Sequence, residues 1–160
     1  MKKFFYPTLL ASLAIIPLNA NAKQTPNQQK ISVVKKVYQN LDQRQDIISN
    51  NASPTLKLAL DHDIASTPAD GVPCQDWGYI GGQDPIIRNI KYTVLKNGNV
   101  RATFKNHGQT EYNDFQFKQV DGKYLINDIW ASDTSLSFLQ DIKYCQEHGL
   151  NLAENIFDDI

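Results

Sequence analysis

Glycine-containing dipeptides divide residues 86–130 into short stretches of alternating polarity, and they limit the possible folds more than any other feature. Asn97-Gly98 is a strong hairpin signal, because both central positions of a type I′ turn require positive φ. His107-Gly108 marks a second loop and Asp121-Gly122 a further tight turn. The sequence therefore predicts four consecutive strands in an antiparallel meander.

Each of the first three predicted strands has one apolar side. These sides comprise Ile86, Ile90, Tyr92 and Val94, then Val100, Ala102 and Phe104, and finally Tyr112, Phe115 and Phe117. The third set changes parity between its first two members, so the sequence predicts a β-bulge near Asn113-Asp114.

Two helical stretches precede the strands. Thr25-Pro26 supplies an N-cap and a first-turn proline, and apolar residues at helical spacing run from Ile31 to Ile48 before Asn50-Asn51 ends the pattern. Ser53-Pro54 starts a second helix. Its apolar side comprises Leu56, Leu60 and Ile64.

A last helix is predicted after the strands, starting within residues 133–135. It carries Leu136, Leu139, Ile142 and Cys145 on one side, and Gly149 is expected to end it. The whole pattern predicts an α+β fold in which N-terminal helices pack on a curved four-stranded antiparallel sheet. The C-terminal helix is expected to be fastened by a disulfide.

The N-terminus has the order of a secretory signal: Lys2 and Lys3, an apolar run, then small residues up to Ala22. We expect residues 1–22 to be a cleaved signal peptide, residues 23–160 to form a single domain, and the protein to be periplasmic or secreted. Neither cysteine lies near the cleavage point, so no lipid or other membrane anchor is expected. The whole chain has a formal charge of −1, and loss of both lysines takes it to about −3, which argues against general nucleic-acid binding.

The chain has only two cysteines, Cys74 and Cys145. In an oxidising compartment an isolated pair is usually joined, and there is no C-x-x-C spacing to favour a redox or metal site. The sequence therefore predicts a Cys74–Cys145 disulfide that fixes the last helix to the loop before the strands.

That loop, CQDWGYIGGQDP at residues 74–85, is the first candidate binding segment. Asp76, Trp77, Tyr79 and Asp84 form the predicted partner-binding set, since aromatic rings on a glycine-rich backbone are frequent at protein interfaces. The alternative is that Trp77 plugs one end of the core. The tail NLAENIFDDI, at residues 151–160, is a second candidate, which could dock on the sheet or on a partner.

We assign no catalytic residue and no metal site. Asp61-His62-Asp63 invites a metal interpretation, but consecutive helical residues do not face one another. Strict alternation places Asp128 on the apolar side of the fourth strand, where a buried carboxylate needs a partner. We expect it to meet Arg88 or a tyrosine hydroxyl, in a structural or an acid–base role.

The segment from Asp121-Gly122-Lys123 to Asp128 also carries a resemblance. An aspartate-glycine-lysine turn followed by aromatic-x-isoleucine-x-aspartate resembles the closing strand of nuclear-transport-factor-2-like proteins. The leading helix, the Ser53-Pro54 helix and Gln75-Asp76 further resemble a secreted bacterial family of unknown function with the same cone-shaped, cystatin-like α+β architecture. The resemblance implies a concave face that serves as an enzyme pocket, a small-ligand pocket or a protein-binding surface.

Two functional hypotheses follow. The first is an exported, non-enzymatic protein that binds another protein, in its sharpest form an immunity protein that neutralises a toxin acting in the periplasm. The alternative is a pocket that binds or converts a small apolar molecule. Its predicted lining comprises Asp128, Tyr92, Tyr124, Trp130 and Arg88. Neither hypothesis requires a cofactor, and the oligomeric state is left open.

Overall fold

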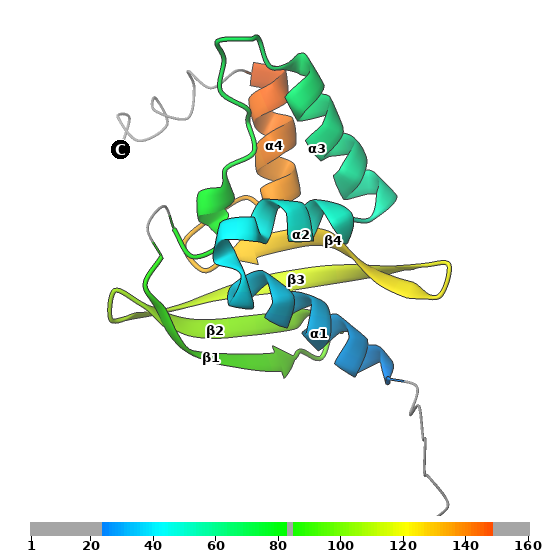
Figure 1. Cartoon of the computed structure of the whole chain (residues 1–160), viewed down its shortest axis with the longest axis vertical. Coiled ribbons are helices and arrows are strands. Elements are labelled where there is room, and N and C mark those ends of the chain that lie inside the picture. Colours follow the sequence, from blue (N-terminus) through cyan, green and yellow to red (C-terminus); the bar gives the residue numbers. More distant parts are fainter. Residues whose placement is uncertain (1–23, 83–84, 149–160) are drawn as a thin grey trace, which may run out of the picture.

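The computed structural model describes residues 24–82 and 85–148, which form an α+β fold (Figure 1). The α+β class and the four-stranded antiparallel sheet are confirmed, with strand order β1-β2-β3-β4. The helices are α1 (Pro26–Gln39), α2 (Arg44–Asn50), α3 (Pro54–Ser66) and α4 (Phe138–His148), with short 3-10 turns at Leu41–Gln43 and Trp77–Tyr79. The strands are β1 (Ile87–Val94), β2 (Val100–Asn106), β3 (Gln109–Val120) and β4 (Lys123–Ala131).

The hairpins form where the glycine dipeptides predict them, but the turn types differ. His107 and Gly108 both have positive φ, at 47° and 86°, as do Asp121 and Gly122, at 49° and 75°. These two pairs have the signature of a type I′ turn. At the first hairpin only Gly98 has positive φ, and its N–H donates to the Leu95 carbonyl, which indicates a type I turn with a glycine bulge. The type I′ prediction for Asn97-Gly98 is therefore wrong, although the hairpin exists.

The predicted bulge in β3 is also misplaced. Asn113 and Asp114 pair without interruption with both neighbouring strands, so Tyr112 simply lies on the other face of the sheet. The register shifts instead lie in β1, between Arg88 and Lys91, and opposite Gln116/Phe117, where β4 carries the extra residue Asn127. A bulge moves the following side chains to the opposite face.

In β1 this shift changes which isoleucine is buried. Asn89 adopts a positive φ of 56° inside the bulge. As a result Ile87 packs against the core, while Ile86, predicted to be inside, is 50% exposed. An asparagine tolerates this left-handed conformation better than a β-branched neighbour would.

The predicted first helix is interrupted. α1 begins at the Thr25 capping box and ends at Asn40, whose ψ of 62° leaves the helical region. α3 starts at its Ser53 N-cap and buries Leu56, Ala59, Leu60 and Asp63. Ile64 is predicted to lie on the apolar side of this helix, but it is 55% exposed, so that prediction is wrong.

The last helix begins later than predicted, because a capping box sets its start. The Gln140 N–H donates to the Ser137 hydroxyl, and the Ser137 N–H donates to the Gln140 side-chain oxygen. α4 therefore starts at Phe138 rather than within residues 133–135. The predicted end at Gly149 lies outside the described residues.

A single apolar core joins α1 and one face of the sheet to buried residues of α2, α3 and α4. Val34, Phe104 and Phe115 have at most 2% of their surface exposed. The Tyr38 ring lies 5.3 Å from that of Phe104, and its hydroxyl donates to the buried Asn113 side chain at 2.5 Å. Burial raises the Tyr38 pKa well above its ordinary value.

The β4 edge of the sheet is covered by the connection between α2 and α3. The Ile126 N–H donates to the Asn51 carbonyl, and the Ser53 N–H donates to the Ile126 carbonyl, both at 2.7 Å. Ala52 thus forms a parallel bridge with Ile126. Edge strands left unpaired invite association, and this contact covers the β4 edge at Ile126.

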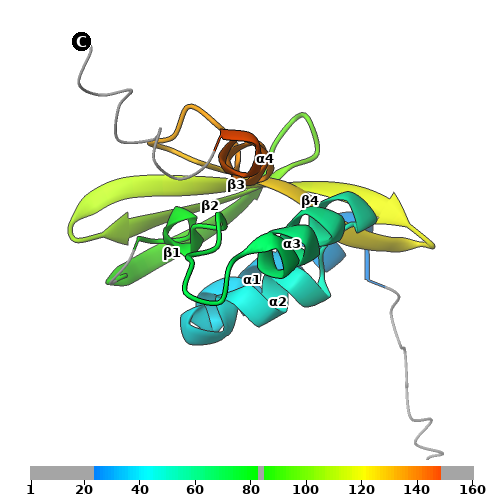
Figure 2. The same ribbon diagram turned by 90° about the horizontal axis from the view of Figure 1, so that it is seen from above.

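In the views of Figures 1 and 2, α1 and α2 lie over one face of the sheet, while α4 stands at the β4 edge and toward the other side. No helix of the described residues covers that second face over β1, β2 and β3. We call this uncovered side the outer face. None of the described helices is long and apolar enough to cross a bilayer.

Candidate functional site

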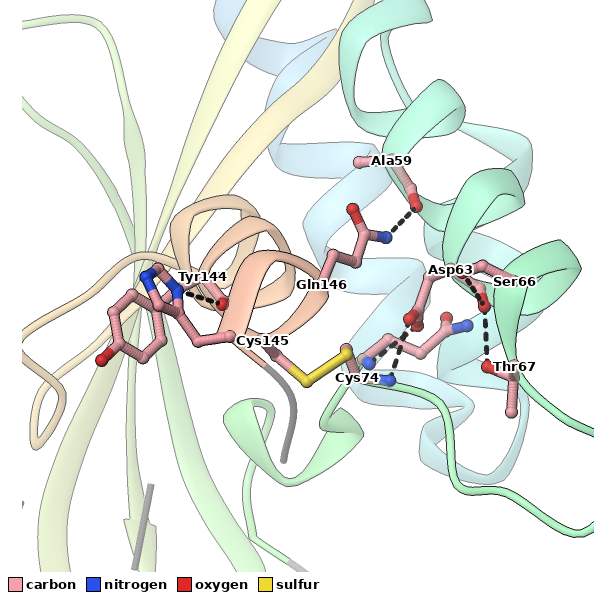
Figure 3. The surroundings of a disulfide bond; sticks show 10 residues. Ala59, Asp63, Ser66, Thr67, Cys74, Tyr144, Cys145 and Gln146 are labelled. Atoms are coloured by element: carbon pink, nitrogen blue, oxygen red, sulfur yellow. Dashed lines mark hydrogen bonds between the residues drawn. A yellow bond between two sulfur atoms is a disulfide. The ribbon is translucent and has the colours of Figure 1, made fainter. Parts of the chain in front are cut away.

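The Cys74–Cys145 disulfide joins the loop that follows α3 to α4, as predicted (Figure 3). The two Cα atoms are 5.7 Å apart, which suits an unforced bridge. Cys145 lies on the buried side of α4 with Ile142. The bridge therefore holds α4 beside α3 at the β4 edge of the sheet.

Asp63 positions the other half of the bridge. Its side chain is 1% exposed, and its carboxylate accepts the backbone N–H groups of Cys74 and Gln75, both at 2.9 Å (Figure 3). The Asp61-His62-Asp63 motif is therefore split: Asp61 pairs with Lys57 on the helix surface, and His62 is exposed. Within residues 24–82 and 85–148, no cluster of three or more potential metal ligands occurs.

The loop containing Trp77 and Tyr79 is held by side chains from three other elements. Arg44 Nε donates to the Trp77 carbonyl at 3.1 Å, and Asn113 Nδ2 donates to the Tyr79 carbonyl at 2.7 Å. Asn106 Nδ2 donates to the Gly81 carbonyl at 3.1 Å. Buried asparagines that satisfy loop carbonyls fix a backbone which has no ladder of its own.

Both rings of this loop pack on α4. The centroids of Trp77 and Tyr79 lie 5.2 Å and 5.5 Å from that of Phe138, and the Tyr79 hydroxyl donates to the Leu136 carbonyl at 2.9 Å. Burial raises the Tyr79 pKa to about 12. Trp77 and Tyr79 are therefore half-buried and cover one end of the apolar core.

Asp76, one of the two acids of the predicted partner-binding set, bonds within its own loop. Asp76 is exposed, and its carboxylate accepts the Gly78 N–H at 2.7 Å within the loop. On α4, burial of Asp141 raises the pKa of that carboxyl, and the nearby negative charge of Asp76 raises it further. Asp84 lies outside the described residues. A cavity of about 140 Å³ lies beside the loop, between Tyr79 and Glu111.

The five residues of the predicted pocket do not come together. Tyr92 and Tyr124 lie under α1, where Lys35 and Lys30 approach their rings. Trp130 pairs with Asp114 and Asp128 with Gln116 on the outer face, and Arg88 pairs with Lys105 on that face as well. The bulge at Asn127 separates Asp128 from the apolar side on which strict alternation placed it.

Asp128 is buried, but its partners are not those expected from the sequence. Its carboxylate accepts the Ser137 hydroxyl at 2.7 Å and the N–H groups of Leu139 and Ile129 at 3.0 and 2.8 Å. A carboxylate at a helix N-terminus is favourable, because the first N–H groups of the helix lack intrahelical acceptors. Asp128 thus ties the start of α4 to β4.

The outer face is the surface that sequence reasoning missed. Residues paired across an antiparallel ladder lie on the same face, so Arg101, between the fully buried Val100 and Ala102, points outward with its partners Thr93 and Asp114. The same register gives the other basic side chains of this face. They are Arg88, Lys91, Lys105, Lys118 and Lys123.

Few acids oppose these bases. Asp114 accepts two hydrogen bonds from Arg101, at 2.6 and 2.7 Å, and Asp128 is engaged with α4. The Asp114 hydrogen bonds raise the Arg101 pKa, and the guanidinium lies 3.8 Å from the Tyr112 ring centroid. The outer face is therefore basic and partly aromatic, although the whole chain has a formal charge of −1.

Two hollows lie beside the basic residues of β1 and β2. A groove of about 550 Å³ is lined by residues that include Lys91, Thr103 and Lys105, and a neighbouring one of about 310 Å³ includes Arg88 and His107. The near-neutral net charge of the chain gives no sign that basic residues gather on one face of the sheet. Alternation along residues 86–125 places these bases on one side only when the β1 bulge is taken into account.

Comparison of the chain with protein-family models, curated proteins and solved structures found no match. The arrangement of side chains must therefore support any functional assignment.

Proposed function

We propose that this chain is an exported, non-enzymatic binding protein, and that its partner is another protein with an acidic surface. The interface is the outer face of the sheet. The observation that carries the proposal is the concentration of Arg88, Lys91, Lys105 and Lys118 on a face that no described helix covers. Charges of opposite sign on two partners steer their encounter and fix the register of the complex.

The helix-covered face offers less room for a ligand. Its centre is filled by Val34, Phe104 and Phe115, which are at most 2% exposed. A concave pocket of the kind that the nuclear-transport-factor-2-like resemblance implies needs open space at this position. This packing supports the binding-protein hypothesis over the small-molecule alternative.

The loop at residues 74–82 is a weaker interface than the outer face. Trp77 and Tyr79 use their rings to cover Phe138, and their carbonyls are already bonded. The free edge of the sheet is also a weaker candidate, because the bulge at Asn89 and the exposed Lys91 are features that discourage strand addition. The face, rather than its edge, suits a folded partner.

Export is part of the proposal. A disulfide persists in an oxidising compartment, and the Cys74–Cys145 bridge is consistent with one. A periplasmic immunity protein is the most specific version of this function, since a basic face would neutralise an acidic surface on its toxin. That version requires one cognate partner, bound tightly.

Site-specific photo-crosslinking in the producing cell tests the proposal. A photoreactive residue replaces Thr103 on the outer face, and in a control it replaces Leu58, which is 71% exposed on α3. We expect one protein adduct at position 103 only. The adduct should weaken roughly tenfold when Lys91→Glu and Lys105→Glu are combined, because rim charges govern encounter and register.

Lys35→Glu with Lys36→Glu is the matched control, since both lysines are exposed on α1, which lies over the opposite face of the sheet. The proposal fails if position 103 yields no adduct, or if the two charge-reversed pairs reduce the adduct equally.

A further inference from the structure

The C-terminal segment at residues 151–160, NLAENIFDDI, has the composition that the outer face would attract. It carries Glu154, Asp158 and Asp159 around Ile156 and Phe157, with no basic residue. We propose that this segment docks on the outer face of its own chain and competes there with the protein partner. The inference rests on the proposed function of that face.

The end of α4 places the segment within reach. Asp128 fixes the start of α4 to β4, and α4 stands at the β4 edge on the side of the sheet opposite α1 and α2 (Figure 2). An 11-residue helix is about 16 Å long, and neighbouring strands are about 4.8 Å apart. Residues 149–160 can extend up to about 40 Å, so they can turn back and reach β2 and β3.

Charge complementarity selects this surface. Lys91, Lys105 and Lys118 are exposed, and the two acids that the strand register places with them, Asp114 and Asp128, are already engaged by Arg101 and by α4. On the helical side the exposed Lys35 and Lys36 are accompanied by exposed acids, namely Asp42, Asp46 and Asp61, so a segment with three carboxylates matches the outer face better.

The apolar residues of the segment also have counterparts. Tyr112, Leu125 and Trp130 lie on the outer face by the register of β3 and β4, and all are partly exposed. Ile156 and Phe157 can cover them while the neighbouring acids reach the lysines. The pairing of apolar centre and charged rim is the usual anatomy of an interface.

Covalent linkage makes a weak contact effective. A short flexible tether gives an effective concentration in the millimolar range, so even millimolar intrinsic affinity would leave the face about half occupied. An acidic partner must then displace the segment. Docking would thus set an affinity threshold that a true partner exceeds and a weakly acidic protein does not.

Competition binding tests the inference with the full chain. The probe is a fluorescein-labelled peptide of sequence NLAENIFDDI, whose anisotropy is measured against the wild-type protein and against a variant with Glu154→Gln, Asp158→Asn and Asp159→Asn. We expect the variant to bind the peptide about twofold more tightly, because release of a half-occupied face doubles the fraction of protein that is free to bind. Combining Lys91→Glu and Lys105→Glu with the variant should abolish this gain.

The matched control is Asp42→Asn with Asp46→Asn, which removes exposed acids from the α1–α2 region and should leave peptide affinity unchanged. Equal peptide affinity of wild type and tail variant overturns the inference while leaving the proposed function intact. No binding to either protein also overturns it, and the photo-crosslinking at position 103 then reports separately on the partner.

Zero-length carbodiimide coupling gives a direct second measurement. In dilute wild-type protein we expect intramolecular links from Lys91, Lys105 or Lys118 to the acids of residues 154–159. Links only to Lys35 or Lys36, which lie on α1 over the opposite face of the sheet, would place the segment elsewhere and overturn the inference.

Discussion

The Asp63 carboxylate on α3 accepts the backbone N–H of Cys74 at 2.9 Å, and Cys74 is joined by the disulfide to Cys145 on α4. The hydrogen bond and the disulfide both hold Cys74. Asp63 is 1% exposed, and its second oxygen accepts the Gln75 N–H. Asp63 is thus a buried residue of α3 that positions the loop containing Cys74.

Replacing Asp63 with asparagine should therefore destabilise the protein. The amide offers one acceptor oxygen where two N–H groups need partners, and it turns its own NH₂ toward one of them. We expect the free energy of unfolding to fall by about 1–3 kcal/mol, as measured by urea denaturation. Asp61→Asn, which affects only the exposed pair with Lys57, should change it by less than about 1 kcal/mol. Equal effects would contradict the role given to Asp63.

Removing the disulfide should cost more. The bridge spans a sequence separation of 71, for which the chain-entropy relation gives about 4 kcal/mol. We expect Cys74→Ser with Cys145→Ser to lower the free energy of unfolding by up to that amount and to loosen α4. The measurement is urea denaturation, with hydrogen exchange of the α4 amides as the local readout. Unchanged α4 exchange would show that Asp128 and the core suffice to hold the helix.

Asp128→Asn separates a structural from a chemical role. The substitution weakens the contacts with the Ser137 hydroxyl and the Leu139 N–H, so we expect a loss of about 1–3 kcal/mol in the free energy of unfolding. The effect should be accompanied by faster exchange at the start of α4, and partner capture at position 103 should persist. Lost capture with unchanged stability would instead make Asp128 a binding residue.

The pattern of apolar residues predicted the helices and strands, but not the faces on which some side chains lie. Strict alternation places Ile86 and Asp128 on the inner face. The bulges at Asn89 and Asn127 break the alternation, so neither side chain lies there. The bulge at Asn127 is held by contacts from other elements: the Ser53 hydroxyl donates to the Asn127 side-chain oxygen, and the Asn127 amide donates to Gln116 on β3. Such long-range contacts have no local sequence signature.

Other features did have a signal. Ser137 and Gln140 have the spacing of a capping box, and reading it would have placed the start of α4 correctly. The disulfide followed from cysteine count and compartment. By contrast, the anchoring of Trp77 and Tyr79 depends on Asn106 and Asn113, which look in the sequence like ordinary strand residues.

Tyr79 predicts a loss of stability at alkaline pH. Burial raises its pKa from 10.0 to about 12 in the folded protein, so the unfolded chain releases this proton first. The resulting stabilisation is fully present below pH 10 and is lost as the pH rises through about 12. We expect the free energy of unfolding to fall more steeply between pH 10 and 12 in wild type than in Tyr79→Phe.

Lysine deprotonation affects both proteins equally, so the difference between their urea midpoints at pH 8 and pH 11 isolates Tyr79. At pH 8 the variant should be less stable by about 1 kcal/mol, because the bond to the Leu136 carbonyl is gone. Parallel pH profiles would show that the hydroxyl of Tyr79 is better hydrated than its burial indicates.

The last prediction separates the loop from the outer face as the binding surface. Trp77→Ala removes a ring that packs 5.2 Å from Phe138 and should lower the free energy of unfolding by about 2–4 kcal/mol. Lys91→Glu with Lys105→Glu changes exposed side chains and should leave stability nearly unchanged. Partner capture should respond in the opposite order: retained by the folded Trp77→Ala protein, weakened roughly tenfold by the reversed lysines, and weakened in wild type by raised salt. Capture that depends on Trp77 and is indifferent to both lysines would return the interface to the loop at residues 74–82, and the basic face would then need another explanation.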